Sequence, residues 1–373
     1  MDSCDVLIVG GGPAGSSCAW RLRNSGLDVA ILDKHVFPRD KVCGGWITPG
    51  VLSELEIDPL AYGRGRVLQP ITSFRTASIE GPAALTDYGK PVSYGILRRE
   101  FDDYLLKRSR SRLFEGESLT SLERTGDQWI ANGRIKARLV VGAGGHFCPV
   151  ARLTGARMPG ESAVVAQEAE VEMDGQQLAQ CRVRGDTPEL YFCSDMKGYG
   201  WCFRKQNALN VGLGRLDRHS LSRHVGDFLS FLKSSGRLAF DIAPALRGHA
   251  YLIYGNSARD IAGDYFMLIG DAAGLAYPQS GEGILPAIES GLFAAETIAG
   301  AKGTYRREKL ESYRGRIAGR FEKSQKHWIT SLGAHLAPGL MSSLARRMVG
   351  MPWFARGVIL DRWFLHRNEA RAS

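Results

Sequence analysis

One stretch near the N-terminus, residues 5–33, constrains the fold of this 373-residue chain more than any other. An apolar run, Val6 to Val9, is followed at once by three glycines in the spacing G-x-G-x-x-G, Gly10, Gly12 and Gly15. Apolar residues at helical spacing come next, and a second apolar run, Val29 to Leu32, ends at Asp33. Strand, glycine turn, helix and second strand in this order predict a βαβ unit that binds a dinucleotide.

Each residue of this unit has a predicted mechanical role. Gly10 permits the tight turn out of the strand, Gly12 lets the backbone approach a pyrophosphate, and Gly15 allows close packing of the helix on the sheet. The free N–H groups at the helix N-terminus, beside Ala14, attract the anion. Asp33 accepts hydrogen bonds from ribose hydroxyls, with Lys34 next to it. An accidental glycine-rich turn is the alternative, and the order of the elements argues against it.

Composition narrows the class of protein. The formal charge of +9 indicates an anionic partner, which could be a cofactor phosphate, an acidic substrate, a lipid surface or nucleic acid. Seven cysteines without a C-x-x-C pair, and Met1 leading directly into a strand, predict reduced thiols and a cytoplasmic location. No run reaches the roughly 18 apolar residues that span a bilayer. The eight histidines show no metal-ligand spacing, so no metal site is expected.

Cys43 lies in a basic segment, residues 37–45, that turns at Gly44-Gly45. A cysteine is often a small buried hydrophobe. Near Arg39 and Lys41, however, its thiol could have a lowered pKa and approach a flat ligand closely. The residues alone leave both interpretations open.

Three further segments, residues 67–94, 168–183 and 190–214, alternate apolar and polar residues and predict strands of a second layer. In the last segment Tyr199, Trp201 and Phe203 fall on one face at a period of two. They form either an aromatic ligand pocket or ordinary sheet core with cross-strand aromatic pairs.

A second glycine-opened site lies far along the chain. Residues 137–142 predict a strand that returns to the first sheet, and residues 266–269 a strand that ends in a Gly-Asp turn at Asp271. Gly283 then opens a long helix from Ile284 to Ala299, whose N-terminus attracts an anion. Arg98 begins another helix, where a cation is unfavourable unless an anion is near. Two glycine-opened anion sites so far apart in the sequence favour a two-part ligand with a flavin end, FAD. They argue against a simple nicotinamide dehydrogenase.

Taken together, these motifs resemble the FAD-dependent geranylgeranyl reductase family, within the flavoproteins shaped like aromatic hydroxylases. The resemblance rests on residues 10–15, 37–45, 98–102, 199–205 and 270–273. It implies an α/β fold in which a Rossmann-type FAD-binding domain is interleaved with an antiparallel-sheet substrate domain, followed by C-terminal helices. The expected FAD-binding segments are 1–68, 92–160 and 260–300, the substrate-sheet segments are 69–91 and 161–259, and the helical region is 301–373.

The resemblance also implies roles for individual residues. Cys43 would be catalytic beside the isoalloxazine, and Tyr199, Trp201 and Phe203 would line the prenyl pocket. The implied cofactor-binding set is Gly10, Gly12, Ala14, Gly15, Asp33, Lys34, Arg39, Cys43, Gly44, Arg98, Asp271, Gly283 and Ile284. Two positions depart from the family pattern, Gly144 in place of an aspartate and Arg204 in place of a proline, and both leave the substrate open.

Three functions are therefore considered. The first is hydride transfer from reduced FAD to a carbon–carbon double bond of an isoprenoid or similar small apolar substrate, with NAD(P)H or another reductant as electron donor. The second is a flavin monooxygenase or halogenase, because the same scaffold serves both. The third is a flavoprotein that modifies or matures a partner protein, which would dock on the basic C-terminal helices. Nucleic acid is not an expected partner.

The C-terminal region is basic and then apolar. Its helices either close the substrate cavity or rest on an anionic membrane surface, which would make the protein peripheral to the membrane. The basic residues are Lys302, Arg306, Arg307, Lys309, Arg314, Arg316, Arg320, Lys323 and Lys326. The apolar residues include Trp328, Ile329, Leu332, Leu336, Leu340, Leu344, Met348, Trp353, Phe354, Ile359, Leu360, Trp363 and Phe364.

Overall fold

The largest sheet is built around β1 (Asp2–Val9), which pairs in parallel with β2 (Val29–Asp33) and with β11 (Ile135–Gly142). Val6, Leu7 and Ile8 are fully buried, as expected for a parallel strand covered on both faces. The sheet order is β17-β18-β11-β1-β2-β8, and β10 and β9 branch from β11. The remaining strands are β8 (Arg112–Glu115), β9 (Leu122–Thr125), β10 (Gln128–Ala131), β17 (Ala262–Gly263) and β18 (Phe266–Leu268).

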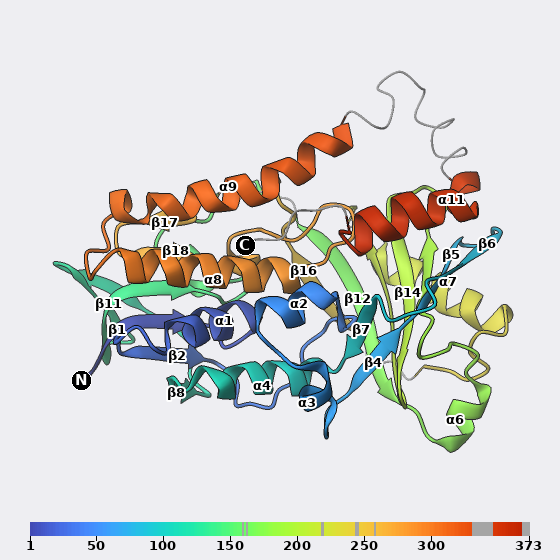
Figure 1. The fold of residues 1–373 in the computed structure, drawn as a ribbon, viewed down its shortest axis with the longest axis horizontal. Coiled ribbons are helices and arrows are strands. Elements are labelled where there is room, and N and C mark those ends of the chain that lie inside the picture. The colour runs from blue at the N-terminus through green and yellow to red at the C-terminus, as the bar shows by residue number, and fades with distance from the viewer. Residues whose placement is uncertain are drawn as a thin grey trace.

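A computed structural model supplies this description for residues 1–158, 160–161, 163–217, 220–242, 246–256, 259–329 and 346–367. Helices α8 and α9 lie in layers above α1, and α4 runs below them near α1 (Figure 1). α8 is apolar and buried along most of its length because it lies between α1 and α9. These helices are α1 (Pro13–Leu22), α4 (Arg98–Ser109), α8 (Ile284–Gly300) and α9 (Arg307–Ile329).

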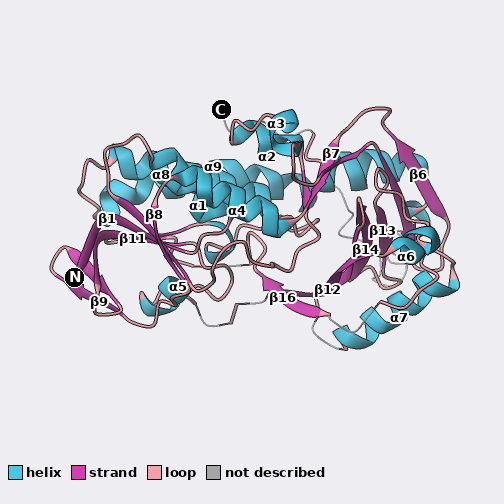
Figure 2. Ribbon diagram, turned by 90° about the horizontal axis from the view of Figure 1, so that it is seen from below, coloured by secondary structure: helices cyan, strands magenta, loops and turns pink. Residues whose placement is uncertain are grey.

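A second sheet of seven strands lies at the other end of the molecule (Figure 2). Its order is β16-β12-β15-β14-β13-β5-β6, so the chain enters it twice, first with β5 and β6 and later with β12 to β16. Its pairs are antiparallel except for β13 with β5. The strands are β5 (Ser73–Ser78), β6 (Ala83–Asp87), β12 (Val164–Glu172), β13 (Glu189–Phe192), β14 (Gly198–Lys205), β15 (Ala208–Arg215) and β16 (Arg247–Tyr251).

The two faces of the second sheet pack against different elements. α7 (Leu221–Ser234) covers one face, where Cys202 of β14 joins a core with Phe228. Tyr199, Trp201 and Phe203 lie on the opposite face, which confirms the period of two. A small sheet of β4 (Leu68–Ile71), β7 (Ser93–Ile96) and β3 (Trp46–Ile47), the short helices α2 (Pro49–Glu54), α3 (Pro59–Gly63) and α5 (Pro149–Leu153) and the 3-10 turn η1 (Gly270–Ala272) complete the main body.

The expected fold class is confirmed: a parallel Rossmann-type sheet, an antiparallel sheet and helices combine in one α/β chain. One predicted segment is wrong. Residues 168–183 do not continue as strand, because β12 ends at Glu172 and α6 (Gly175–Gln180) follows. Asp174 accepts from the Gln177 backbone N–H and the Gln177 side chain accepts in return, a capping box that starts a helix after the strand.

The C-terminal part divides into two described pieces. In α9, Arg320 forms a buried ion pair with Glu289 of α8 (3.0 Å), and Arg307, Arg314 and Arg316 also pair with carboxylates, so much of its positive charge is used internally. Residues 346–367 form α11 (Pro352–Phe354) and the π-helical segment η2 (Ala355–Phe364), which packs on the aromatic face of the second sheet. Leu332, Leu336, Leu340 and Leu344 lie outside the described residues. None of the described helices has the length and apolar character needed to cross a bilayer.

Candidate active site

A cavity of about 660 Å³ lies where the two large sheets meet. The turn after β1, the loop of residues 39–46, the start of α8, the face of β14 and Phe364 all contribute to its wall. It therefore extends from the predicted pyrophosphate site to the predicted aromatic pocket. All the site residues predicted from the sequence line it except Gly15, which lies beneath the turn.

The three motif glycines serve different purposes. A side chain on Gly10, whose φ is +116°, would collide with the Ala143 carbonyl group, and one on Gly15 would collide with the Gly10 carbonyl oxygen. Gly12 differs, because the only atom near its absent Cβ is Nη2 of Arg39, 3.5 Å away. Gly10 and Gly15 are required by packing, whereas Gly12 keeps the cavity side of the turn open.

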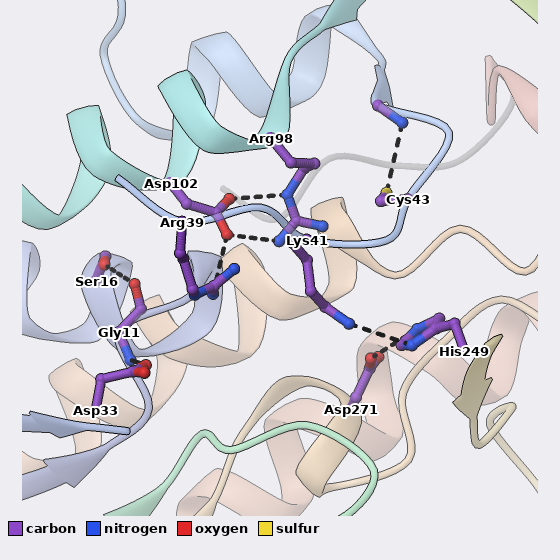
Figure 3. A network of polar contacts seen from close by, with 11 residues as sticks. Gly11, Ser16, Asp33, Arg39, Lys41, Cys43, Arg98, Asp102, His249 and Asp271 are labelled. Carbon is purple, nitrogen blue, oxygen red and sulfur yellow. Dashed lines mark hydrogen bonds and ion pairs between the residues drawn. The ribbon is translucent and has the colours of Figure 1, made fainter. Parts of the chain in front are cut away.

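Asp33 is held at the end of β2 by two backbone donors. The N–H of Gly11 donates to its Oδ2 (2.7 Å) and the N–H of His35 to its Oδ1 (2.9 Å; Figure 3). These bonds fix the carboxylate at the cavity wall. Each oxygen still has a free lone pair with which to accept from a ribose hydroxyl.

A buried ion cluster lies beside Gly12. Arg98 donates two bonds of 2.8 Å to Asp102, and Arg39 Nη2 lies 3.1 Å from the same carboxylate (Figure 3). Asp102 is thus the anion expected near Arg98 at the start of α4. Burial opposes the charge of Arg98, but Asp102 and Cys43 outweigh it, so the pKa of Arg98 lies above its ordinary value.

Arg39 supplies a direct test of whether a dinucleotide fits. Its Nη1 is buried and has no hydrogen-bond partner among the described residues. A buried donor without an acceptor is costly, so the geometry calls for an acceptor from a ligand. A pyrophosphate over Gly12 would provide one, and the open cradle, Arg39 and Asp33 together fit the diphosphate and ribose of FAD.

The start of α8 forms the other half of the site. Gly283 precedes the helix without a side-chain cap, and Gly283 and Ile284 both line the cavity. The first N–H groups of the helix can therefore serve a ligand that carries partial negative charge. Asp271 lies beside Gly283, and burial raises its pKa although Lys41 and Arg98 oppose that shift.

His249 of β16 joins this half of the site and was not predicted. Its Nδ1 lies 3.2 Å from Lys41 Nζ and its Nε2 4.0 Å from Asp271 Oδ2 (Figure 3). Burial and the nearby Lys41 lower the pKa of His249 to about 3, so the ring is neutral and accepts from Lys41. Burial and Arg98 also lower the pKa of Lys41. A lone histidine in a strand carries no sequence signal for such a contact.

The loop at Cys43 is held by the second sheet. Asn210 Nδ2 donates to the Cys43 carbonyl oxygen (3.2 Å), and Lys205 Nζ donates to the carbonyl oxygens of Gly44 and Ile96 (3.1 Å each). Lys205 also pairs with Glu170. Lys205 appeared in the sequence only as the end of the aromatic motif, and Asn210 carried no signal.

The far wall of the cavity is aromatic. Trp46 contacts Phe203 edge-on and stacks on Phe364, with ring centroids 5.7 Å and 5.2 Å apart, and Tyr199 contacts Phe364. Trp201 completes this wall and donates to Asn210 Oδ1 (2.7 Å). The two alternatives for the aromatic residues of β14, ligand pocket and sheet core, therefore both apply, because these residues pack in a core and also line the cavity. Phe364 shows that the C-terminal segment closes this end.

Gly144, the first departure from the family pattern, also lines the cavity. A Cβ there would lie 3.1 Å from Pro149 Cδ and 3.2 Å from Cys148 Cα, closer than side chains ordinarily approach. Glu168 of β12 is a further cavity residue that the sequence interpretation missed. The one feature of the sequence that could have indicated it is an acidic residue at an inward-facing position of a predicted strand.

We predict that Gly12→Val folds but does not retain FAD. The new side chain meets only the end of Arg39 within the protein, yet it occupies the place of the pyrophosphate. Absorbance of the bound flavin after gel filtration measures retention, and thermal unfolding of the FAD-free protein checks the fold. Gly226→Val, at an exposed position of α7 with no atom within 4 Å of its absent Cβ, is the control for a valine at a glycine position. Yellow, stoichiometrically loaded Gly12→Val protein would contradict the assignment.

Comparison with known proteins identifies the family. Residues 5–85 match the FAD dependent oxidoreductase family. The chain is 30% identical to menaquinone reductase of Mycobacterium tuberculosis, over 80% of this chain and 77% of that protein. It is 27% identical to digeranylgeranylglycerophospholipid reductase 1 of Methanothermobacter thermautotrophicus, with the same coverage.

Solved structures share the fold. A geranylgeranyl bacteriochlorophyll reductase-like protein of Thermoplasma acidophilum superposes with a TM-score of 0.77 at 23% identity, over 94% of this chain and 92% of that one. Flavin-dependent halogenases have the fold as well, at lower TM-scores. With the FAD cradle, the aromatic cavity and the reductase relatives, the chain belongs to the geranylgeranyl reductase family of FAD-dependent oxidoreductases.

Proposed function

We propose that this enzyme reduces carbon–carbon double bonds of an isoprenoid or similar long apolar substrate. The observation that carries the proposal is the single cavity that joins the dinucleotide cradle at Gly12 to an aromatic wall at Trp201 and Phe203. An apolar chain against that wall would lie next to the flavin end of the cofactor. The names of the related reductases support a prenyl lipid as the substrate class.

Different residues of the chain bind the cofactor and the substrate. Bound FAD, once reduced by NAD(P)H or another donor, supplies the hydride. Gly12 and Arg39 hold its pyrophosphate, Asp33 its ribose, and the N–H groups at Gly283 and Ile284 its pyrimidine edge. The aromatic wall binds the apolar substrate and excludes water from the reacting bond.

We predict that the FAD-loaded protein, reduced without oxygen and mixed with a geranylgeranyl phospholipid, yields a product heavier by two hydrogens for each double bond reduced. Without oxygen, reduced FAD beside the apolar cavity cannot form an oxygenating species, so the expected reaction is net addition of hydrogen to the substrate. Mass spectrometry of the extracted lipid measures the product. Gly12→Val protein is the control for cofactor dependence. A product that gains oxygen or halogen in air, with no reduction in its absence, would favour the monooxygenase or halogenase alternative.

Cys43 is the proposed catalytic residue of the loop, as a proton donor or as a group that positions the substrate beside the flavin. Its sulfur accepts from the Gly45 N–H (3.5 Å), and the Arg98 guanidinium faces it. Unlike the six other cysteines, Cys43 is only partly buried.

We predict that Cys43→Ala binds FAD and unfolds at an unchanged temperature, but turns over about 10²-fold more slowly. The loop keeps its shape because Asn210 and Lys205 hold backbone oxygens rather than the thiol. Steady-state reduction of the lipid measures the loss. Cys4→Ala, in β1 away from the cavity, is the matched control. A Cys43→Ala enzyme with full activity would make Cys43 a packing residue.

We also propose that the lipid enters from an anionic membrane through residues 346–356. This segment exposes Met351 and Trp353, the latter 63% accessible, and three arginines that are also exposed, Arg346, Arg347 and Arg356. The same segment continues into η2 and ends at Phe364 on the cavity wall. Apolar side chains ringed by cations are suited to an anionic lipid surface. The expectation of a protein partner on these helices stays a prediction.

We predict that the protein co-sediments with anionic vesicles and not with neutral ones, and that salt weakens binding. Trp353→Ser should lower the vesicle affinity by about tenfold or more, because a large side chain no longer enters the lipid. Leu60→Ser, which removes a side chain 77% exposed on α3, is the control and should bind as the unmodified protein does. Absence of binding at low salt would leave these residues with a structural role alone.

A further inference from the structure

Glu168 occupies an unusual place in the cavity wall. It lies in the middle of β12, is 5% exposed and lines the cavity. Gly212 of β15 is opposite both Glu168 and Trp201 in the sheet. A side chain on Gly212 would collide with Glu168 Cβ and with the Trp201 indole, so its absence lets these two side chains approach each other. The acid therefore borders the aromatic wall where an apolar substrate would bind.

Asn210 lies between this acid and the Cys43 loop. The indole N–H of Trp201 can only donate, so the side-chain oxygen of Asn210 must face it (2.7 Å). The amide nitrogen then points the other way, where it donates to the Cys43 carbonyl oxygen and lies 3.4 Å from Glu170. Asn210 also lies next to the Glu168 carboxyl group and lowers its pKa by favouring the charged form. One fully buried amide thus bonds the Cys43 loop and borders Glu168.

The charged and titratable groups around Glu168 come from four elements. Lys205 of β14 and Lys41 of the loop favour its carboxylate, and Glu170 of the same strand disfavours it. Tyr199 of β14 and Tyr251 of β16 also face it. Burial is the largest influence and raises the pKa of Glu168 to about 7, against 4.5 ordinarily. Glu168 can therefore hold a proton at neutral pH. When it releases that proton, its own carboxylate is stabilised by the ammonium groups of Lys205 and Lys41.

The other acids of the cavity have different positions. Asp33 is bound by backbone N–H groups in the dinucleotide half, and Asp271 lies by Gly283 and His249. In the described part of the chain, Glu168 is the one cavity acid carried by the second sheet. Glu282, a further acid of the cavity, also lies near Tyr199, but its carboxyl group is 3.3 Å from His366 Nε2.

We propose that Glu168 donates the proton that accompanies the hydride, and that Asn210 positions its carboxyl group. Cys43 then acts by positioning the substrate beside the flavin. The proposal rests on the proposed reduction. Reduced FAD delivers hydride to one carbon of the double bond, and the π electrons take the proton from the Glu168 O–H at the other carbon. Two C–H bonds form, the O–H bond breaks, and FAD is left oxidised for reduction by NAD(P)H or another two-electron donor. Water returns a proton to the Glu168 carboxylate.

The first test compares Glu168→Gln with Glu172→Gln, a substitution at an exposed position of the same strand. We expect Glu168→Gln to lower kcat about 10²-fold or more with little change in KM, as for loss of a general acid. The unmodified enzyme should lose activity as the pH rises through about 7, because the acid must be protonated, and the variant should lack this decrease. Glu172→Gln should keep both rate and pH profile.

Asn210→Ala tests the positioning role separately. The Asn210 amide favours the carboxylate, so its loss should move the decrease in activity to higher pH as well as lower kcat. A substitution that acted only by loosening the fold would leave the midpoint of the pH profile in place.

A second readout needs neither FAD nor turnover. Infrared difference spectra of the FAD-free protein, titrated from acid to alkaline pH, should show a protonated carboxyl band that disappears near pH 7 and is missing in Glu168→Gln. If the unmodified enzyme reduces the lipid and Glu168→Gln does so equally well with the same pH profile, the proton-donor role is overturned and the proposed function stands. If the unmodified enzyme does not reduce double bonds, the proposed function itself is overturned.

Discussion

The close approach of backbones around α1 is the constraint on which the rest of the structure depends. The turn of β1 into α1 packs Gly15 on the Gly10 carbonyl group, and on the other side Gly291 of α8 packs on the Ala14 carbonyl group. Gly270 of the turn after β18 approaches Ala14 as well, with 3.0 Å between its absent Cβ and Ala14 Cβ. Without side chains at these points, α1 fits between the sheet and α8. The N-termini of both helices then open into one cavity, so a single ligand can reach both.

The charges of the cavity are arranged around the same geometry. Arg39 and Arg98 converge near the cradle, and Asp102, the carboxylate that pairs with both, balances only one of their two charges. A protein interior keeps such an excess when a ligand brings the missing anion. At the other end of the cavity the wall is aromatic, and Glu168 is buried beside it.

Much of this architecture could be predicted because its signals are local. The glycine turn, its flanking strands, the Gly-Asp turn at Asp271 and the pattern of Tyr199, Trp201 and Phe203 each lie within a few consecutive residues. Asn210 and His249 could not be predicted, because each acquires its role from a partner far along the chain. Asn210 bonds a residue 167 positions earlier, and His249 bonds one 208 positions earlier. The helix α6 was missed for a different reason, since alternation outweighed a capping box that was present in the sequence.

The stacking of Phe364 on Trp46 has a consequence for how this enzyme can diversify. The dinucleotide cradle is built from the first strands and α8, whereas the lid over the aromatic wall comes from η2, a segment that belongs to neither large sheet. Substitutions in η2 can therefore reshape the space for the substrate without disturbing the glycine turn or the sheet that carries it. Selection for a longer, shorter or more polar substrate has a separate part of the chain to act on, and cofactor affinity can be preserved while the chemistry is applied to new molecules.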